Sequence, residues 1–161
     1  ISIDGFPKNR IVLLKEFNND GFTFYTNYNS EKGLSISKNN KVCLSFFCEE
    51  HERQVIIKGH AKKISDLKSN EYFNSRPRGS QLGAIVSDQS TVIDSKDELV
   101  KKLHELENKY INTSIPKPSH WGGYLVSPVE YEFWQGGENR LHDRARFLYK
   151  NDNWIKDRLS P

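Results

Sequence analysis

A β-hairpin is predicted by Arg10-Ile-Val-Leu-Leu-Lys-Glu-Phe-Asn-Asn-Asp-Gly-Phe-Thr-Phe-Tyr-Thr-Asn27. Arg10–Lys15 carries apolar residues on both faces, which predicts a strand inside a sheet that is covered on both sides. Asp20-Gly21 closes a polar turn and is a strong hairpin signal. Phe22–Asn27 is rich in aromatic and β-branched residues, as a returning strand should be. This part of the chain therefore indicates antiparallel β-structure.

The rest of the chain repeats this pattern around grouped helices. Further strands are predicted at Lys41–Glu50, Arg53–Ile64 with a bulge at Gly59, Trp121–Val126, Val129–Gln135, Asp143–Lys150 and Trp154–Leu159. Helices are predicted at Ser30–Ser37, Asp66–Asn74, Pro77–Val86 and after the capping box Ser95–Glu98. Consecutive hairpins with inserted helices favour a mostly β, antiparallel barrel with peripheral helices, formed as a single domain over residues 1–161.

Composition sets outer limits on function. The 161 residues are 35% hydrophobic and 28% charged, with a net charge of +3, and no apolar run is long enough to span a membrane. Cys43 and Cys48 are an odd number of residues apart in one predicted strand, so they should not pair, and a reduced, cytoplasmic setting is the simplest interpretation. No metal-type spacing is present. The chain begins at Ile1 and contains no methionine. We therefore expect the native protein to begin earlier, with Ile1–Gly5 as a strand end running into a turn.

A cationic stretch near the C-terminus is the first candidate site. It runs from Trp134 through Gln-Gly-Gly-Glu-Asn-Arg-Leu-His-Asp to Arg144. As an extended strand it would place Arg140, His142 and Arg144 on one face, where an anion could lie between them. A solvated basic edge strand explains the same pattern equally well.

Two helix starts are further candidates. Ser30 and Lys32 open one predicted helix, and Arg76, Arg78 and Ser80 lie at the start of another. Backbone N–H groups at such starts suit a phosphate. A simple N-cap at Ser30 and a solvated turn at Arg76 remain the alternatives.

Taken in order, nine stretches carry a resemblance to a known family. They are Arg10–Lys15, Phe24–Asn27, Glu52–Val55, Tyr72–Arg78, Ser87–Ser90, Trp121–Tyr124, Glu132–Gly137, Arg140–Arg144 and Arg158–Pro161. In sequence and spacing they resemble the pyridoxine/pyridoxamine 5′-phosphate oxidase family.

The resemblance implies an FMN-binding split β-barrel and a homodimer with two flavins at the subunit interface. It also implies oxidation of pyridoxine or pyridoxamine 5′-phosphate to pyridoxal 5′-phosphate. Molecular oxygen accepts the electrons and becomes hydrogen peroxide, and pyridoxamine phosphate also releases ammonia.

By resemblance, the predicted site residues divide by ligand. FMN would contact Arg10, Ile11, Val12, Leu13, Leu14, Lys15, Tyr25, Thr26, Lys32, Gln54, Gln89, Ser90, Trp134 and Arg144, with Gln89 and Ser90 reaching the partner subunit's flavin. The substrate phosphate would be held by Lys15, Tyr72, Arg76 and Ser80. Arg140 and His142 would lie over the pyridine ring as the catalytic pair, positioning the ring and stabilising charge near its phenolic oxygen.

Two departures from the family pattern accompany these assignments. Glu31 stands where the family usually has a cation near the flavin phosphate, and a family segment that can fold over the active site is absent from the start of this sequence. The alternatives are a related split-barrel oxidase of phenazine biosynthesis, a flavin reductase, and a non-catalytic flavin- or pyridoxal-phosphate-binding protein. Nucleic-acid binding is disfavoured because the basic residues are dispersed.

Overall fold

A computed structural model describes residues 5–161 of the chain. This range contains seven β-strands and four α-helices. In order they are β1 (Glu16–Asn18), β2 (Gly21–Asn27), α1 (Glu31–Lys38), β3 (Lys41–Cys48), β4 (Arg53–Lys63), α2 (Asp66–Ser75), α3 (Arg78–Val86), α4 (Lys96–Lys109), β5 (Trp121–Gln135), β6 (Asp143–Lys150) and β7 (Asn153–Leu159). Short 3₁₀ turns lie at Glu49–His51 and Glu138–Arg140. The strand end predicted at Ile1–Asp4 lies outside the described residues.

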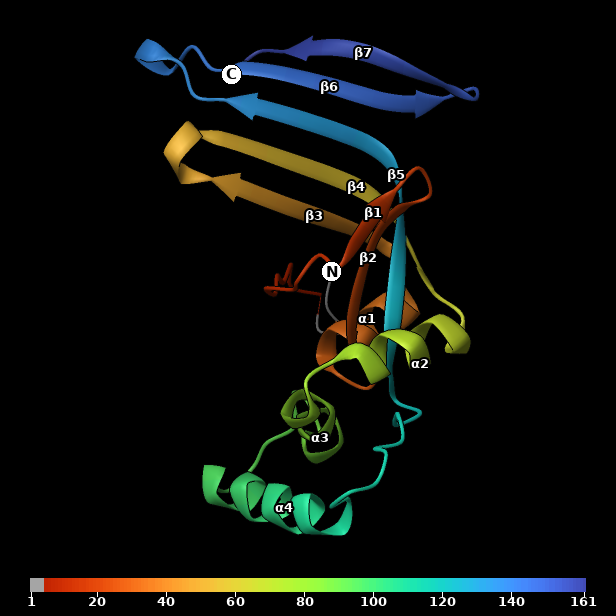
Figure 1. Cartoon of the computed structure of the whole chain (residues 1–161). Helices are drawn as coiled ribbons and strands as arrows, with labels where there is room; N and C mark the ends of the chain where they lie inside the picture. The colour runs from red at the N-terminus through yellow and green to blue at the C-terminus, as the bar shows by residue number, and fades with distance from the viewer. Residues whose placement is uncertain (1–4) are drawn as a thin grey trace.

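The described strands form one antiparallel sheet. Its order is β1-β2-β5-β4-β3, with β6 on the second half of β5 and β7 on β6. In Figure 1, α3 and α4 lie at one end of the molecule and β6 and β7 at the other, with β5 running between them. The mostly β, antiparallel architecture with peripheral helices is confirmed.

Local turn chemistry fixes two of the hairpins. Asn18 pairs with Gly21, which leaves a two-residue turn between β1 and β2 as predicted. Between β6 and β7, Asn151 and Asp152 have φ values of 52° and 59°. Positive φ at both central positions is the geometry of a type I′ turn, which matches the twist of the flanking strands. The turn predicted at Asp20-Gly21 is therefore confirmed.

The predicted strand Arg10–Lys15 is wrong. Within the described chain the first strand begins only at Glu16, residues 5–15 have no regular secondary structure, and Ile11 is 98% exposed. Lys15 N still donates to Thr23 O at 2.9 Å, which extends the pairing with β2 by one residue. Upstream of that bond no strand pairing is formed within the described chain, and Lys8 and Arg10 form ion pairs with Glu31 of α1. An apolar run becomes a strand only where a neighbouring strand is there to pair with it.

The two strands predicted at Trp121–Val126 and Val129–Gln135 are one strand of 15 residues, β5. β2 pairs with β5 before Pro128 and β6 pairs with it after Pro128, so this proline lies between two partners on that edge. On the opposite edge Pro128 faces Gly59, where the register with β4 shifts. The missing proline N–H therefore interrupts no regular ladder. The register shift at Gly59 confirms the irregularity predicted there as a bulge or bend, and the unpaired residue is Val129 of β5.

Capping chemistry fixes the helix starts. Ser30 Oγ accepts a hydrogen bond from Gly33 N at 3.3 Å, and Ser95 Oγ accepts one from Glu98 N at 3.4 Å. Both predicted N-caps are confirmed. Pro77 takes the N-cap position of α3, immediately before the helix.

Two hydrophobic clusters hold these elements together. The first joins α1 to the sheet through Phe24, Ile36, Ala61, Tyr124 and Val126. The second contains Phe73, Leu82, Ile115 and Trp121, and Leu103, Leu106 and Tyr110 pack against it. Leu103 and Leu106 belong to α4 and Tyr110 is its C-cap, so these contacts dock the helix against a cluster that includes Trp121 at the start of β5.

Cys43 and Cys48 are unpaired and exposed, as their spacing predicted. No helix within residues 5–161 has the length and apolar character needed to cross a membrane.

Candidate active site

A cavity of about 530 Å³ opens where α1, α2 and α3 meet the end of β2 and the start of β5. The segment before β1 forms another of its walls. Many of the predicted site residues line it: Ile11, Val12, Leu13, Lys15, Tyr25, Thr26, Lys32, Tyr72, Arg76, Ser80 and Gln89. The fold therefore brings together most of the predicted flavin residues and the residues predicted for the substrate phosphate.

Lys32 provides a cation at one side of this cavity. Its Nζ donates to Thr26 Oγ1 at 2.7 Å and to Ser30 Oγ at 3.4 Å. Burial, together with the nearby positive charge of Arg10, lowers the pKa of Lys32. Within residues 5–161 this ammonium has hydroxyl partners and no carboxylate partner. An anion that enters the cavity would be the counter-ion that Lys32 lacks.

Gln89 belongs to the same side of the cavity. Thr26 Oγ1 donates to Gln89 Oε1 at 3.3 Å. The resemblance assigns Gln89 to the partner subunit's flavin, whereas here it lines the cavity of its own chain. Ser90 is exposed, has a φ of 75°, and is not part of the lining.

Three aromatic rings that stack on one another form one wall of the cavity. The ring centroids of Tyr25 and Tyr72 are 3.9 Å apart, and those of Tyr25 and Trp121 are 5.4 Å apart. Burial raises the pKa of Tyr25, so its hydroxyl stays protonated at neutral pH. Lys15 Nζ lies 6.0 Å from the centre of the Tyr72 ring. This wall offers apolar area with a cation at its edge.

Arg76 provides the second cation of the cavity. Its Cζ lies 4.7 Å from the centre of the Trp121 ring. Its Nη1 is buried and has no hydrogen-bond partner within the described part of the chain. Burial lowers the pKa of Arg76, since the charged form is poorly solvated there. Buried donors are normally paired, so this one indicates an anionic ligand.

The neighbouring Arg78 serves the fold. Its guanidinium donates to Thr113 O at 3.0 Å and also to Tyr110 O. These bonds tie the start of α3 to the end of α4. Of the two arginines at this turn, only Arg76 lines the cavity, together with Ser80 from the first turn of α3.

A second group of predicted residues lies near the far end of β5. Gln54 pairs with Trp134, and Trp134 pairs with Arg144, across β4, β5 and β6. The His142 ring centre is 4.8 Å from that of Trp134. Gly137 N donates to His142 Nδ1 at 3.2 Å, so the proton of the neutral imidazole is on Nε2. We call these residues, together with Arg140, the β5-end group.

The extended strand predicted across Trp134–Arg144 is wrong. β5 ends at Gln135, and a 3₁₀ turn at Glu138–Arg140 separates it from β6. Asn139 and Arg140 have φ values of 54° and 63°, which no strand contains. The cause is Gly136-Gly137, because the chain folds back so tightly that a Cβ on Gly137 would lie 2.4 Å from Leu141 O. Arg140, His142 and Arg144 therefore do not share a strand face.

The β5-end group does not line the larger cavity, and neither do Arg10 and Leu14. Trp121 and Trp134 mark the two sites at opposite ends of a 15-residue strand. At about 3.3 Å per residue, they are roughly 40 Å apart along β5. Arg144 also already has a carboxylate partner, since its Nε donates to Glu132 Oε1 at 2.7 Å. Within one chain the predicted site is thus divided into two parts.

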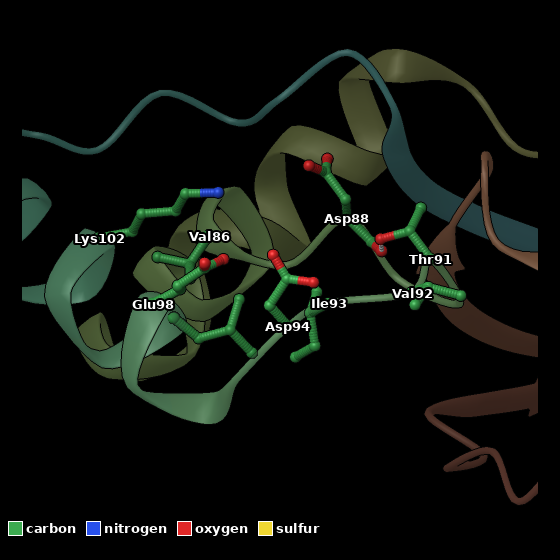
Figure 2. A pocket seen from close by; sticks show the side chains of 9 residues that line it. Val86, Asp88, Thr91, Val92, Ile93, Asp94, Glu98 and Lys102 are labelled. Carbon is green, nitrogen blue, oxygen red and sulfur yellow. Dashed lines mark hydrogen bonds between the residues drawn. The ribbon is translucent and has the colours of Figure 1, made fainter.

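A smaller hollow of about 190 Å³ lies between the loop after α3 and the start of α4 (Figure 2). Asp88, Asp94 and Glu98 line it, with Lys102 as its one lysine. The excess of carboxylates would repel a phosphate. The larger cavity is therefore the site for an anionic ligand.

Three polar or aromatic residues of the cavity have no role predicted from the sequence: Asn27, Ser87 and Trp121. Trp121 forms its aromatic wall, and Asn27 lines it while donating to Ser87 O at 3.3 Å. The available signal for Trp121 is the Gly122-Gly123 pair that follows it. A Cβ on Gly122 would lie 2.2 Å from the Tyr28 hydroxyl, so this strand start requires glycine for close packing.

Two solved structures share this fold. PhzG from Burkholderia lata 383, in complex with tetrahydrophenazine-1-carboxylic acid, has a TM-score of 0.93 at 24% identity, covering 100% of this chain and 79% of that one. A pyridoxamine 5′-phosphate oxidase-related, FMN-binding protein from Nostoc punctiforme has a TM-score of 0.75 at 14% identity, covering 100% and 84%. At these identities the likeness shows the fold alone. The chain has the FMN-binding split β-barrel fold, as predicted.

Family models match nearly the whole chain. The model described as pyridoxamine 5′-phosphate oxidase matches residues 1–110. The model described as the pyridoxine 5′-phosphate oxidase C-terminal dimerisation region matches residues 121–161, which supports a homodimer.

Curated relatives agree with these models. Proteins named pyridoxine/pyridoxamine 5′-phosphate oxidase are 58% identical in Flavobacterium johnsoniae, over 99% of this chain and 75% of the relative, and 52% identical in Acaryochloris marina, over 100% and 74%. The chain therefore belongs to the pyridoxamine 5′-phosphate oxidase family, a family of flavoprotein oxidases.

Proposed function

We propose that this chain oxidises pyridoxine 5′-phosphate and pyridoxamine 5′-phosphate to pyridoxal 5′-phosphate, using FMN and molecular oxygen and releasing hydrogen peroxide. The observation that carries the proposal is the larger cavity, where Lys32 and Arg76 are two partly buried cations without carboxylate partners in the described chain. Two phosphates, one on the cofactor and one on the substrate, would meet this need. The names of relatives at 52–58% identity support the same reaction.

The residues present fit FMN. Lys32, at the start of α1, would hold the cofactor phosphate, assisted by Arg10 and by the backbone N–H groups of this helix start. Ile11, Val12 and Leu13 would supply the wall beside the flavin. The unpaired charge of Lys32 is the physical reason for placing the phosphate here.

The substrate phosphate fits the Arg76 side of the cavity. Arg76 would donate from its unpartnered Nη1, with Lys15 as a further cation and Tyr72 and Ser80 as hydroxyl donors. A guanidinium suits phosphate because two of its N–H groups can bind in parallel. The proposed subsites place the two phosphates on separate cations.

We propose that the β5-end group completes the site of the partner subunit. A ligand in the cavity of one chain is out of reach of that chain's own Trp134, which lies at the opposite end of β5. The region matched by the dimerisation model contains Trp134, Arg140, His142 and Arg144. The exposed aromatic side chains Phe47 and Phe133 add apolar area at this end of the sheet, suited to burial against a second copy. Gln54, Trp134 and Arg144 would then complete the flavin contacts across the interface.

The chemistry belongs to the cofactor: FMN when bound accepts a hydride from the substrate carbon C4′ and passes the electrons to oxygen. The chain's residues bind and orient the substrate. His142, whose Nδ1 is engaged by Gly137 N, can donate a hydrogen bond from Nε2 to the phenolic oxygen of the substrate ring. Arg140 would stabilise negative charge on the same oxygen. Positioning against the flavin is the larger part of the rate enhancement that we expect from the protein.

A peroxide assay tests the reaction. FMN-loaded protein should consume oxygen and release hydrogen peroxide with pyridoxine 5′-phosphate, and pyridoxamine 5′-phosphate should also release ammonia. Yellow protein that makes no peroxide with either substrate would overturn the proposal in favour of a flavin-binding carrier. Turnover of a phenazine precursor alone would assign the chain to the phenazine branch.

Mixed dimers test the shared site separately. Arg76→Met alters the cavity, and His142→Ala alters the β5-end group. When the two inactive variants are mixed and allowed to exchange subunits, one site of each mixed dimer contains only unaltered residues. About a quarter of the wild-type activity should return. No recovery, with exchange verified by mass spectrometry, would place the whole site in one chain.

We also propose a cytoplasmic location, which suits the free thiols of Cys43 and Cys48.

A further inference from the structure

Glu31 forms two ion pairs beside the larger cavity. It is the first residue of α1 and precedes Lys32, whose ammonium lies in the cavity. Its Oε1 is bonded to Lys8 Nζ and its Oε2 to Arg10 Nη2. Both carboxylate oxygens therefore bind cations from the segment before β1.

These ion pairs fasten one end of a cavity wall. The segment Lys8–Lys15 has no regular secondary structure, and its other end is held by the bond from Lys15 N to Thr23 O. Between the two ends, Ile11 and Leu13 line the cavity while 98% and 67% exposed, so burial contributes little to holding them. Val12 alone of this stretch packs against the core cluster. The ion pairs of Glu31 are therefore side-chain contacts that hold the Lys8–Arg10 end of this wall to α1.

The balance of charge at the start of α1 also favours a role for Glu31 in positioning the cations around it. A lone carboxylate next to Lys32 would repel a phosphate, but Lys8, Arg10 and Lys32 outnumber it three to one. Arg10 lies close enough to Lys32 for its charge to act on that lysine. Arg10 and Lys32 repel each other. The carboxylate of Glu31 offsets this repulsion by binding Arg10, and a bound phosphate would offset it further by binding both cations.

We infer that Glu31 is a positioning residue for the cofactor: it holds Arg10 beside Lys32 and keeps Lys8–Lys15 in place as the wall of the cavity. This inference rests on the proposed binding of FMN in that cavity.

The sign of one substitution tests it. If Glu31 positions Arg10, Glu31→Gln should weaken FMN binding by about threefold to tenfold, the range that two solvent-exposed ion pairs support. If Glu31 only repels the phosphate, the same variant should bind FMN more tightly, and that result would overturn the inference. Affinity is measured by quenching of FMN fluorescence on titration with apoprotein. Glu105→Gln, an exposed site on α4 with the same change of charge, is the control and should leave affinity unchanged.

Two further variants identify the route of the effect. In an Arg10→Gln background, Glu31→Gln should cause much less than its single-variant loss, because the residue that it positions is gone. Glu31→Asp keeps the carboxylate and should recover most of the affinity. Additive losses in the double variant would contradict a role through Arg10.

A readout without flavin separates this inference from the proposed function. Trypsin should cleave after Arg10 several times faster in Glu31→Gln apoprotein than in Glu105→Gln apoprotein, because a guanidinium released from its ion pair can enter the protease. Equal cleavage rates would overturn the inference even if FMN binds. Failure of the wild-type chain to bind FMN, with faster cleavage of the variant, would overturn the proposed function and leave the anchoring role of Glu31 in place.

Discussion

Replacing Arg76 by methionine should separate ligand binding from stability. The Arg76 guanidinium lies 4.7 Å from the centre of the Trp121 ring, and its buried Nη1 has no partner within residues 5–161. Methionine keeps an unbranched apolar stem and removes the charge. The substitution removes a buried, unsatisfied donor from the ligand-free protein. In the bound protein it removes a charged donor that would bind the ligand phosphate.

The expected magnitudes follow from these two contacts. An unsatisfied buried donor costs about 1–3 kcal/mol, and its removal is offset by the loss of a cation–π contact of about 0.5–2 kcal/mol. The two nearly cancel, so the Tm of the ligand-free variant should change by no more than about 4 °C for a chain of this length. A hydrogen bond to a charged group contributes about 1.5–3 kcal/mol, so the affinity for pyridoxal 5′-phosphate should fall about 10- to 150-fold.

The assay combines thermal unfolding at fixed protein concentration with a spectroscopic titration of pyridoxal 5′-phosphate. Arg78→Met is the matched control, because Arg78 donates to the backbone of Thr113 and Tyr110 and does not line the cavity. That variant should lose stability and keep its affinity. Two results together would refute this prediction for Arg76→Met. They are a fall in Tm of much more than about 4 °C and an affinity for pyridoxal 5′-phosphate equal to that of the wild type.

Two other predictions concern α1. Gly33→Ala should destabilise the protein by about 1–3 kcal/mol, because its Cβ would lie 2.2 Å from Tyr28 O; thermal unfolding checks this against Gly79→Ala, where nothing lies within 4 Å. The hydrogen bond from Lys8, with the charges of Lys8 and Arg10, holds the pKa of Glu31 below its ordinary value of 4.5. Its ion pairs are therefore complete above pH 4.5 and are lost as the pH falls through the lower folded-state pKa. FMN affinity should fall more steeply in acid for the wild type than for Glu31→Gln, and parallel pH profiles would contradict this.

Local chemistry explains which elements could be predicted from the sequence. The turns at Asn18–Gly21 and Asn151–Asn153, like the cap at Ser30, depend on residues within three positions of one another. The strand predicted at Arg10–Lys15 failed because its apolar pattern carries no information on tertiary contacts, such as the ion pairs that join Lys8 and Arg10 to Glu31, which are 23 and 21 positions away. The extended face predicted for Arg140–Arg144 failed because strand periodicity was applied beyond Gly136-Gly137, which turn the chain.

For the site, residue chemistry identified the cations but not their grouping. The residue types at Lys32 and Arg76 indicated anion binding at two helix starts, and both cations line one cavity. The family resemblance supplied Trp134 and His142, and it remains the sole basis for their catalytic and flavin roles. The sequence did not show that these residues lie far from the cavity in their own chain. Ser127-Pro128 reads as a break between two strands, although β5 continues through it.

The length of β5 therefore has a direct consequence for function. β5 runs from Trp121 in the cavity to Gln135, one residue past Trp134 of the β5-end group, and its register with β4 shifts where Pro128 faces Gly59. Within one chain these two ends cannot contact the same ligand. In a symmetric dimer, however, each strand would supply one end to each of two sites. The bulge would then set the angle at which the two half-sites face each other.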